Sequence, residues 1–173
     1  MQAISWWPVF IAVIIATISD IRSRKIPNWL VVPLLLSGLA FSGIVEGWHG
    51  LSQSLLGILL ASVAVGVFYL LGGMGMGDVK LCAAVGAWIG PAQLGLALVL
   101  TGFAGGLMAL GWAICGGFLH EALQGAGDLI LGVRKRGLRP HETLVLANAA
   151  TRRMPYAPAI AAGTILSFLA VPK

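Results

Sequence analysis

Apolar and polar positions are grouped along this chain in long blocks. A membrane-spanning helix needs about 20 apolar residues at about 1.5 Å each, and the apolar blocks approach or exceed that length. They are residues 4–19, 29–45, 51–71, 79–89, 92–119 and 155–171. We therefore predict an all-α integral membrane protein with six transmembrane helices, forming one membrane-embedded domain over residues 1–173. The short fourth block is expected to begin in the preceding loop or to continue past Gly90-Pro91 into the fifth.

Composition narrows the class of protein further. The chain is 58% hydrophobic and only 10% charged, with a mean hydropathy of +0.94, and a soluble domain carries far more charge. The net charge of +5 is best explained by the Lys/Arg excess of cytoplasmic loops. We therefore expect membrane lipid as a partner and no nucleic acid.

The positions of the basic residues predict the orientation. With six spans, ten of the eleven Lys and Arg residues fall in the first, third and fifth connections, and only Lys173 lies on the opposite side. Since short cytoplasmic loops are enriched in Lys and Arg, both termini are expected outside. Residues 119–133 carry apolar positions at helical spacing, which predicts a cytoplasmic amphipathic segment between helices five and six. A plain solvated connection explains the same stretch equally well.

Glycine is frequent, with 24 residues, and several are spaced by four. Small residues at this spacing let membrane helices approach closely. We therefore expect these glycines to serve helix packing: Gly43 and Gly47, Gly73 and Gly77, Gly86 and Gly90, Gly102 and Gly106.

Two acidic residues differ from the other four in lying at the ends of apolar blocks. Asp20 closes the first block and Asp78 opens the fourth, both on the predicted cytoplasmic side. Each has an alternative structural explanation, because Asp78 can cap a helix start and Asp20 can pair with the basic residues that follow it. An ionisable group at membrane depth is costly, however, and is by default a candidate functional residue.

Together the two acids predict a specific chemistry. Gly75 and Gly77 remove side chains beside Asp78, so that a peptide backbone can approach. Two neighbouring carboxyl groups in a medium of low dielectric constant share one proton, as in aspartic proteases. One then activates water and the other donates to the oxyanion. Such chemistry needs no metal or other cofactor, and the three histidines have no metal-ligand spacing.

These residues resemble the type IV prepilin peptidase family of membrane aspartyl proteases. The resemblance lies in Asp20 followed by basic residues and Ile26-Pro27-Asn28, in a GxGD motif from Gly75 to Asp78 that continues into Lys80, and in Pro155-Tyr156-Ala157-Pro158. It implies a multi-pass protease of the bacterial or archaeal cytoplasmic membrane. Its substrate would be a prepilin or prepilin-like protein with a basic leader peptide, cut at the cytoplasmic face.

The resemblance also implies roles for residues. Asp20 and Asp78 would be the catalytic pair, and we expect substrate contacts from Gly75, Gly77, Pro27, Asn28 and Lys80. Lys80 equally fits a helix-end residue whose charge reaches the interface. The long form of the family carries an amino-terminal segment with paired CxxC motifs, and these are not found here. We therefore expect a short form without methyltransferase activity.

Two alternatives use the same residues differently. A small proton-coupled transporter would carry protons on its intramembrane carboxylates. A non-catalytic pilus-assembly scaffold would use the basic loops to bind partners. A transporter would also be expected to show internal repeats, and the sequence contains no convincing repeat.

Overall fold

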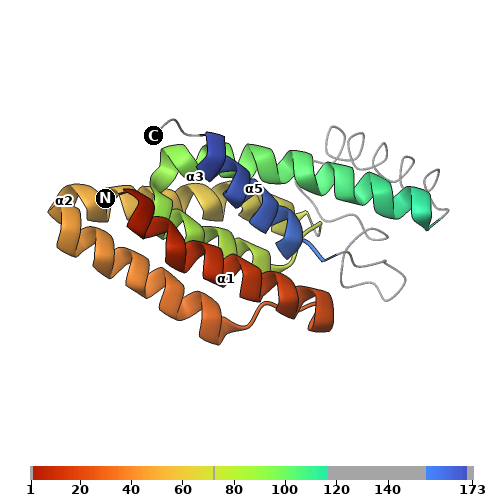
Figure 1. Cartoon of the computed structure of the whole chain (residues 1–173), viewed down its shortest axis with the longest axis horizontal. Coiled ribbons are helices and arrows are strands. Elements are labelled where there is room, and N and C mark those ends of the chain that lie inside the picture. The colour runs from red at the N-terminus through yellow and green to blue at the C-terminus, as the bar shows by residue number, and fades with distance from the viewer. Residues whose placement is uncertain (1, 72, 117–154, 171–173) are drawn as a thin grey trace.

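The computed structural model describes residues 2–71, 73–116 and 155–170, and within these ranges every regular element is an α-helix. The helices are α1 (Gln2–Ser23), α2 (Asn28–Leu70), α3 (Met76–Cys115) and α5 (Ala157–Ala170). They lie side by side along the long axis of the molecule (Figure 1). The predicted all-α class is confirmed, while the predicted amphipathic segment lies outside the described residues.

The chain leaves α1 through a left-handed turn. Arg24 has a φ of 51°, and its N–H donates to the carbonyl oxygen of Asp20 at 2.8 Å, which is how many helices end. Pro27, with φ −74° and ψ 136°, then precedes the first residue of α2. Its carbonyl oxygen accepts from the N–H of Leu30 at 3.2 Å. The connection is therefore short, and it brings the end of α1 close to the start of α2.

α2 turns back on itself at Gly47. This residue has a φ of 59° and a ψ of −140°, a conformation open to glycine and strained for other residues. A Cβ atom on Gly50 would collide with the carbonyl oxygen of Ser42, eight residues earlier. In a straight helix those residues lie about 12 Å apart. The two halves of α2 therefore form a hairpin (Figure 1).

α3 reverses in the same way at Gly90, which has a φ of 73° and a ψ of 174° and is followed by Pro91. A Cβ atom on Gly86 would lie 2.9 Å from Cδ2 of Leu94, which a straight helix does not allow. The breaks predicted between the second and third blocks, and between the fourth and fifth, are thus kinks inside continuous helices. As the sequence allowed, the fourth block begins earlier than its apolar run and continues through Gly90.

α1, α2 and α3 are each long and apolar enough to cross a membrane, and α5 is a shorter apolar helix. With 43 and 40 residues, α2 and α3 would each extend about 60–65 Å if straight, about twice the thickness of a hydrocarbon layer. Each reversal lies close to the middle of its helix. The half-helices therefore have lengths suited to single crossings.

Small residues fill the interior and large apolar side chains face outward. Buried positions are mostly Ala, Val, Gly, Ser and Thr, whereas many Leu, Ile, Phe and Trp side chains are exposed. The hydroxyl of buried Ser54 donates to the carbonyl oxygen of Ala87 at 2.6 Å, joining α2 to α3. This distribution is the reverse of that in a soluble protein and is typical of helices packed in lipid.

The glycines divide into packed and open positions. Gly86 packs backbone to backbone against Gly57, so the packing prediction holds there. It is wrong for Gly43, Gly102 and Gly106, because a Cβ atom at any of them would meet nothing within 4 Å among the described residues. Spacing alone does not reveal which face of a helix meets a neighbour.

α1 and α5 pack antiparallel. Near the start of α1 the ring of Trp6 lies 5.0 Å from that of Phe168, near the end of α5. At the other end, Asp20 of α1 contacts Ala157, the first residue of α5. The amino end of α1 and the carboxyl end of α5 therefore share one end of the bundle (Figure 1).

Candidate active site

Asp20 lies in the last turn of α1 and is buried, with 7% of its surface exposed. Its Oδ2 atom accepts a hydrogen bond from the N–H of Ala157 at 3.0 Å. That donor comes from the amino end of α5, 137 residues away in the chain. The contact supplies the hydrogen bond that a buried carboxyl group requires.

Asp78 is the third residue of α3 and is equally buried, with 8% of its surface exposed. Its Oδ2 atom accepts from the N–H of Gly75 at 3.2 Å, and its own N–H donates to the carbonyl oxygen of Gly75 at 3.1 Å. An acid in the first turn of a helix commonly caps that turn in this way. The alternative structural explanation of Asp78 is thus real and does not exclude a further role.

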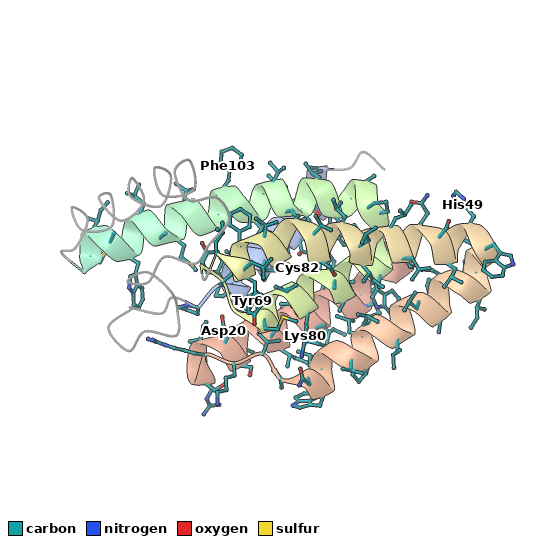
Figure 2. The ribbon with its side chains drawn as sticks, turned by 180° about the vertical axis from the view of Figure 1, so that it is seen from behind. Asp20, His49, Tyr69, Lys80, Cys82 and Phe103 are labelled. Carbon is teal, nitrogen blue, oxygen red and sulfur yellow. The ribbon has the colours of Figure 1, made fainter. Side chains whose placement is uncertain are left out.

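The two acids meet at one end of the bundle. The charge of Asp20 acts on the carboxyl group of Asp78. Figure 2 shows Asp20 beside Lys80, which follows Asp78 by two residues, with His49 at the far end of the molecule. The end of α1 and the starts of α2, α3 and α5 converge here. Two buried acidic residues from separate helices therefore lie within electrostatic range of each other.

Tyr156 completes this end of the bundle from the residue before α5. Its ring packs on α3 at Gly105, where a Cβ atom would lie 3.2 Å from Cε1 of the ring. Burial raises the pKa of the Tyr156 hydroxyl above its ordinary value, and the charge of Asp78 adds to the effect. The hydroxyl therefore stays protonated at neutral pH and is available as a hydrogen-bond donor.

The structure provides packing reasons for both glycines of the GxGD motif. A Cβ atom on Gly77 would lie 3.1 Å from Cβ of Ile26, and one on Gly75 would lie 3.2 Å from Oδ2 of Asp78. Each position thus has a neighbour within the chain itself. Their predicted role in letting a substrate backbone approach stays a prediction.

The other expected substrate contacts gather at the starts of α2 and α3. Nζ of Lys80 donates to Oδ1 of Asn28 at 3.2 Å in an exposed contact, and Pro27 directly precedes Asn28. Lys80 thus has a polar partner at this end of the bundle. The substrate role of these three residues stays a prediction.

Residue-type reasoning missed the contribution of the backbone N–H of Ala157. Its signal in the sequence was the Pro155-Tyr156-Ala157-Pro158 motif, which carried no assigned role. A backbone donor has no side chain to reveal it, and only the packing of α5 against α1 brings this one to Asp20.

Among the described residues, no group of three or more His, Cys, Asp and Glu side chains gathers as metal ligands would. The two aspartates offer fewer protein ligands than a closed metal site usually has. The expectation that no metal takes part stays a prediction.

Comparisons with known proteins point in one direction. Residues 7–110 match the type IV leader peptidase family. A prepilin leader peptidase/N-methyltransferase of Aeromonas hydrophila is 34% identical over 102 residues, covering 55% of this chain and 35% of the relative. The protein of that name from Bacillus subtilis is 29% identical over 165 residues, covering 93% and 54%. In Escherichia coli the corresponding figures are 32% over 118 residues, covering 65% and 51%.

The chain thus spans about a third to a half of the length of these relatives, and no solved structure matches it. Neither the family nor its relatives support the transporter alternative. The apolar helices and the bacterial relatives together indicate a bacterial membrane protein. Because the family match covers more than half of the chain, and includes Asp20 and Asp78, this protein belongs to the type IV leader peptidase family.

Proposed function

We propose that this protein is a membrane aspartyl endopeptidase that removes the leader peptide from type IV prepilins or prepilin-like proteins. The observation that carries the proposal is the pair of buried acids, Asp20 from α1 and Asp78 from α3, in electrostatic contact at one end of the bundle. Family membership gives the pair its chemistry, since the relatives are named as leader peptidases.

In the proposed reaction one aspartate is ionised and the other protonated. The ionised acid takes a proton from a water molecule while the water oxygen bonds to the carbonyl carbon of the scissile peptide. The protonated acid donates to the carbonyl oxygen as charge develops there. When the tetrahedral intermediate collapses, the C–N bond breaks and the departing nitrogen takes up a proton. The result is a carboxylic acid and an amine, with one water consumed.

We further propose that the protein is a single domain with six membrane crossings. α1, the two halves of α2, the two halves of α3, and α5 would each cross once. The reversals at Gly47 and Gly90 support this count. The antiparallel packing of α1 and α5 supports an even number of crossings, with both ends on one side. The basic residues beside Asp20 and Asp78 favour the cytoplasmic face for the site.

The substrate would reach this end of the bundle from the membrane. Prepilin is the partner that family membership implies, and lipid would cover the exposed apolar side chains of the helices. We propose that Lys80, Asn28 and Pro27 contact the substrate, because they lie at the starts of α2 and α3 beside the acids. Gly75 and Gly77 would face the same strand.

Isosteric substitution of the acids tests the function. Asp20→Asn and Asp78→Asn should each abolish leader removal from a co-expressed prepilin, followed as a mobility shift, while the enzyme stays in the membrane. Glu46→Gln is the matched control, because it makes the same change at an exposed acid next to the Gly47 reversal, far along α2 from Asn28. Full processing by either aspartate variant would refute the proposal.

A further inference from the structure

Asp20 depends on another helix for its hydrogen bond, whereas Asp78 does not. Asp20 lies in the last turn of α1, where free carbonyl groups create a partial negative charge that disfavours an anion. Asp78 lies in the first turn of its own helix and is capped by Gly75. Among the described residues, the hydrogen bond found for the Asp20 carboxyl group comes from the N–H of Ala157. That donor lies at a helix amino end, where the partial charge is positive.

The first turn of α5 is arranged to leave this donor free. Pro158 has no N–H, and the N–H groups of Ala159 and Ile160 donate to the carbonyl oxygen of Tyr156 at 3.0 and 3.2 Å. The N–H of Ala157 is thus the one directed at Asp20. Ala157 itself is fully buried, with 0% exposure, so water does not compete for the bond. A charge-assisted hydrogen bond of this kind favours the ionised form of its acceptor.

α3 fixes the position of that donor. The absence of a side chain at Gly105 lets the Tyr156 ring and Ala159 pack closely, with a virtual Cβ atom 3.2 Å from Cε1 and 3.6 Å from Cβ respectively. Further along, Gly163 packs against Thr101 and lies close enough that a Cβ atom would be 2.7 Å from the carbonyl oxygen of Ala97. The amino end of α5 is therefore clamped to the helix that carries Asp78.

We propose that the amino end of α5 is a third part of the catalytic centre, in which Ala157 acts as a positioning residue. Its N–H orients Asp20 and keeps it ionised, so that Asp20 accepts the proton of the attacking water and Asp78 carries the proton given to the oxyanion. This inference rests on the proposed function and assigns the two roles within it. α5 thereby joins α1 and α3 as a determinant of activity.

Other titratable groups at this end of the bundle also bear on the charge of Asp20. Within the described residues they are Asp78 and Lys80 of α3, Tyr69 at the end of α2, Tyr156 before α5, and Arg22, Arg24 and Lys25 after Asp20. The three basic side chains are exposed, and Lys80 is bonded to Asn28. Solvent weakens the effect of the exposed charges on a buried group. The buried N–H of Ala157 is screened least.

Substitution at Ala157 tests the proposal in the full-length protein, in detergent, with a prepilin substrate. Ala157→Pro deletes the N–H at a helix position that tolerates proline. It should lower kcat by about tenfold to a hundredfold with KM nearly constant. The acidic limb of the pH–activity profile should move to higher pH, because Asp20 then ionises less readily. Ala157→Gly keeps the donor and should lose at least about tenfold less activity than the proline variant.

Gly105→Ala provides a second test that does not touch the donor residue. The new methyl group must displace the Tyr156 ring by a few tenths of an ångström, which moves the start of α5 relative to Asp20. We expect a smaller fall in kcat with the same change in pH profile. The control is Gly106→Ala, whose Cβ atom would meet nothing within 4 Å in the part of the chain described and which should behave as wild type.

The outcomes separate this inference from the proposed function. If Asp20→Asn or Asp78→Asn still cleaves, the proposed function fails. If both are inactive, but Ala157→Pro and Gly105→Ala keep the wild-type kcat and pH profile, only the role of α5 is overturned. If Ala157→Pro does not fold, the comparison of Gly105→Ala with Gly106→Ala decides.

Discussion

The crossing of α2 and α3 at Gly57 and Gly86 leads to a quantitative prediction for stability. In Gly86→Ala the new Cβ atom would lie 2.7 Å from the carbonyl oxygen of Gly57, against 3.4 Å for ordinary contact, so the helices must separate by about 0.7 Å. Overpacking of this kind costs about 1–3 kcal/mol. The bond from Ser54 to the Ala87 carbonyl, 2.6 Å long, lies one residue away and would weaken, at a cost of up to about 1 kcal/mol.

An opposing term reduces this cost, because replacing glycine by alanine within a helix stabilises it by about 0.5–1 kcal/mol. The net expectation for Gly86→Ala is a loss of about 1–3 kcal/mol in the free energy of unfolding. Reversible denaturant unfolding of the purified protein in micelles, followed by tryptophan fluorescence, measures it.

Gly102→Ala is the matched control on the same helix. Its Cβ atom would have no neighbour within 4 Å among the described residues, so only the helix-propensity term remains. This variant should be as stable as the wild type or more stable by up to about 1 kcal/mol. Equal stability of the two alanine variants would refute the close approach of α2 and α3 at Gly86.

Three further predictions follow from other parts of the structure. Gly90→Ala should destabilise by about 1–3 kcal/mol, seen in the same unfolding assay, because its φ of 73° with ψ of 174° is open essentially to glycine alone; unchanged stability would contradict the reversal. Lys80→Met and Asn28→Ala should each raise KM for prepilin by about threefold to tenfold with kcat near wild type, and unchanged KM would remove both from the proposed substrate contacts. In a phenolate absorbance titration, Tyr156, assigned by its loss in Tyr156→Phe, should ionise above the ordinary range, because burial and then the Asp78 charge raise its pKa; Asp78→Asn should bring that ionisation to lower pH, and no change would show that the two groups do not interact.

Much of the architecture could be predicted because lipid is a demanding solvent. Apolar blocks of about 20 residues are required of any helix that crosses it, so the blocks outlined the helices before their packing was known. The same solvent makes acids at helix ends rare, and this drew attention to Asp20 and Asp78 from six acidic residues in total. Both lie buried at one end of the bundle.

The packing of glycines, by contrast, was only partly predictable. A spacing of four residues places two glycines on one side of a helix, but it carries no information on what faces that side. Gly86 meets Gly57, which the spacing did not pair with it, whereas Gly102 and Gly106 meet nothing in the described part of the chain. The predicted breaks near residues 47 and 90 were real reversals, yet they occur by a single positive φ instead of a loop.

The sequence by itself determined which segments are apolar and which acids lie at their ends, because the transfer of each residue type into lipid is a local property. Only the tertiary structure decided that the N–H of Ala157 meets Asp20, and that Gly105 lets Tyr156 pack beside it. Every residue except proline carries a backbone N–H, so no residue type marks the one that will be used. Its partner is chosen by how helices far apart in the chain pack together.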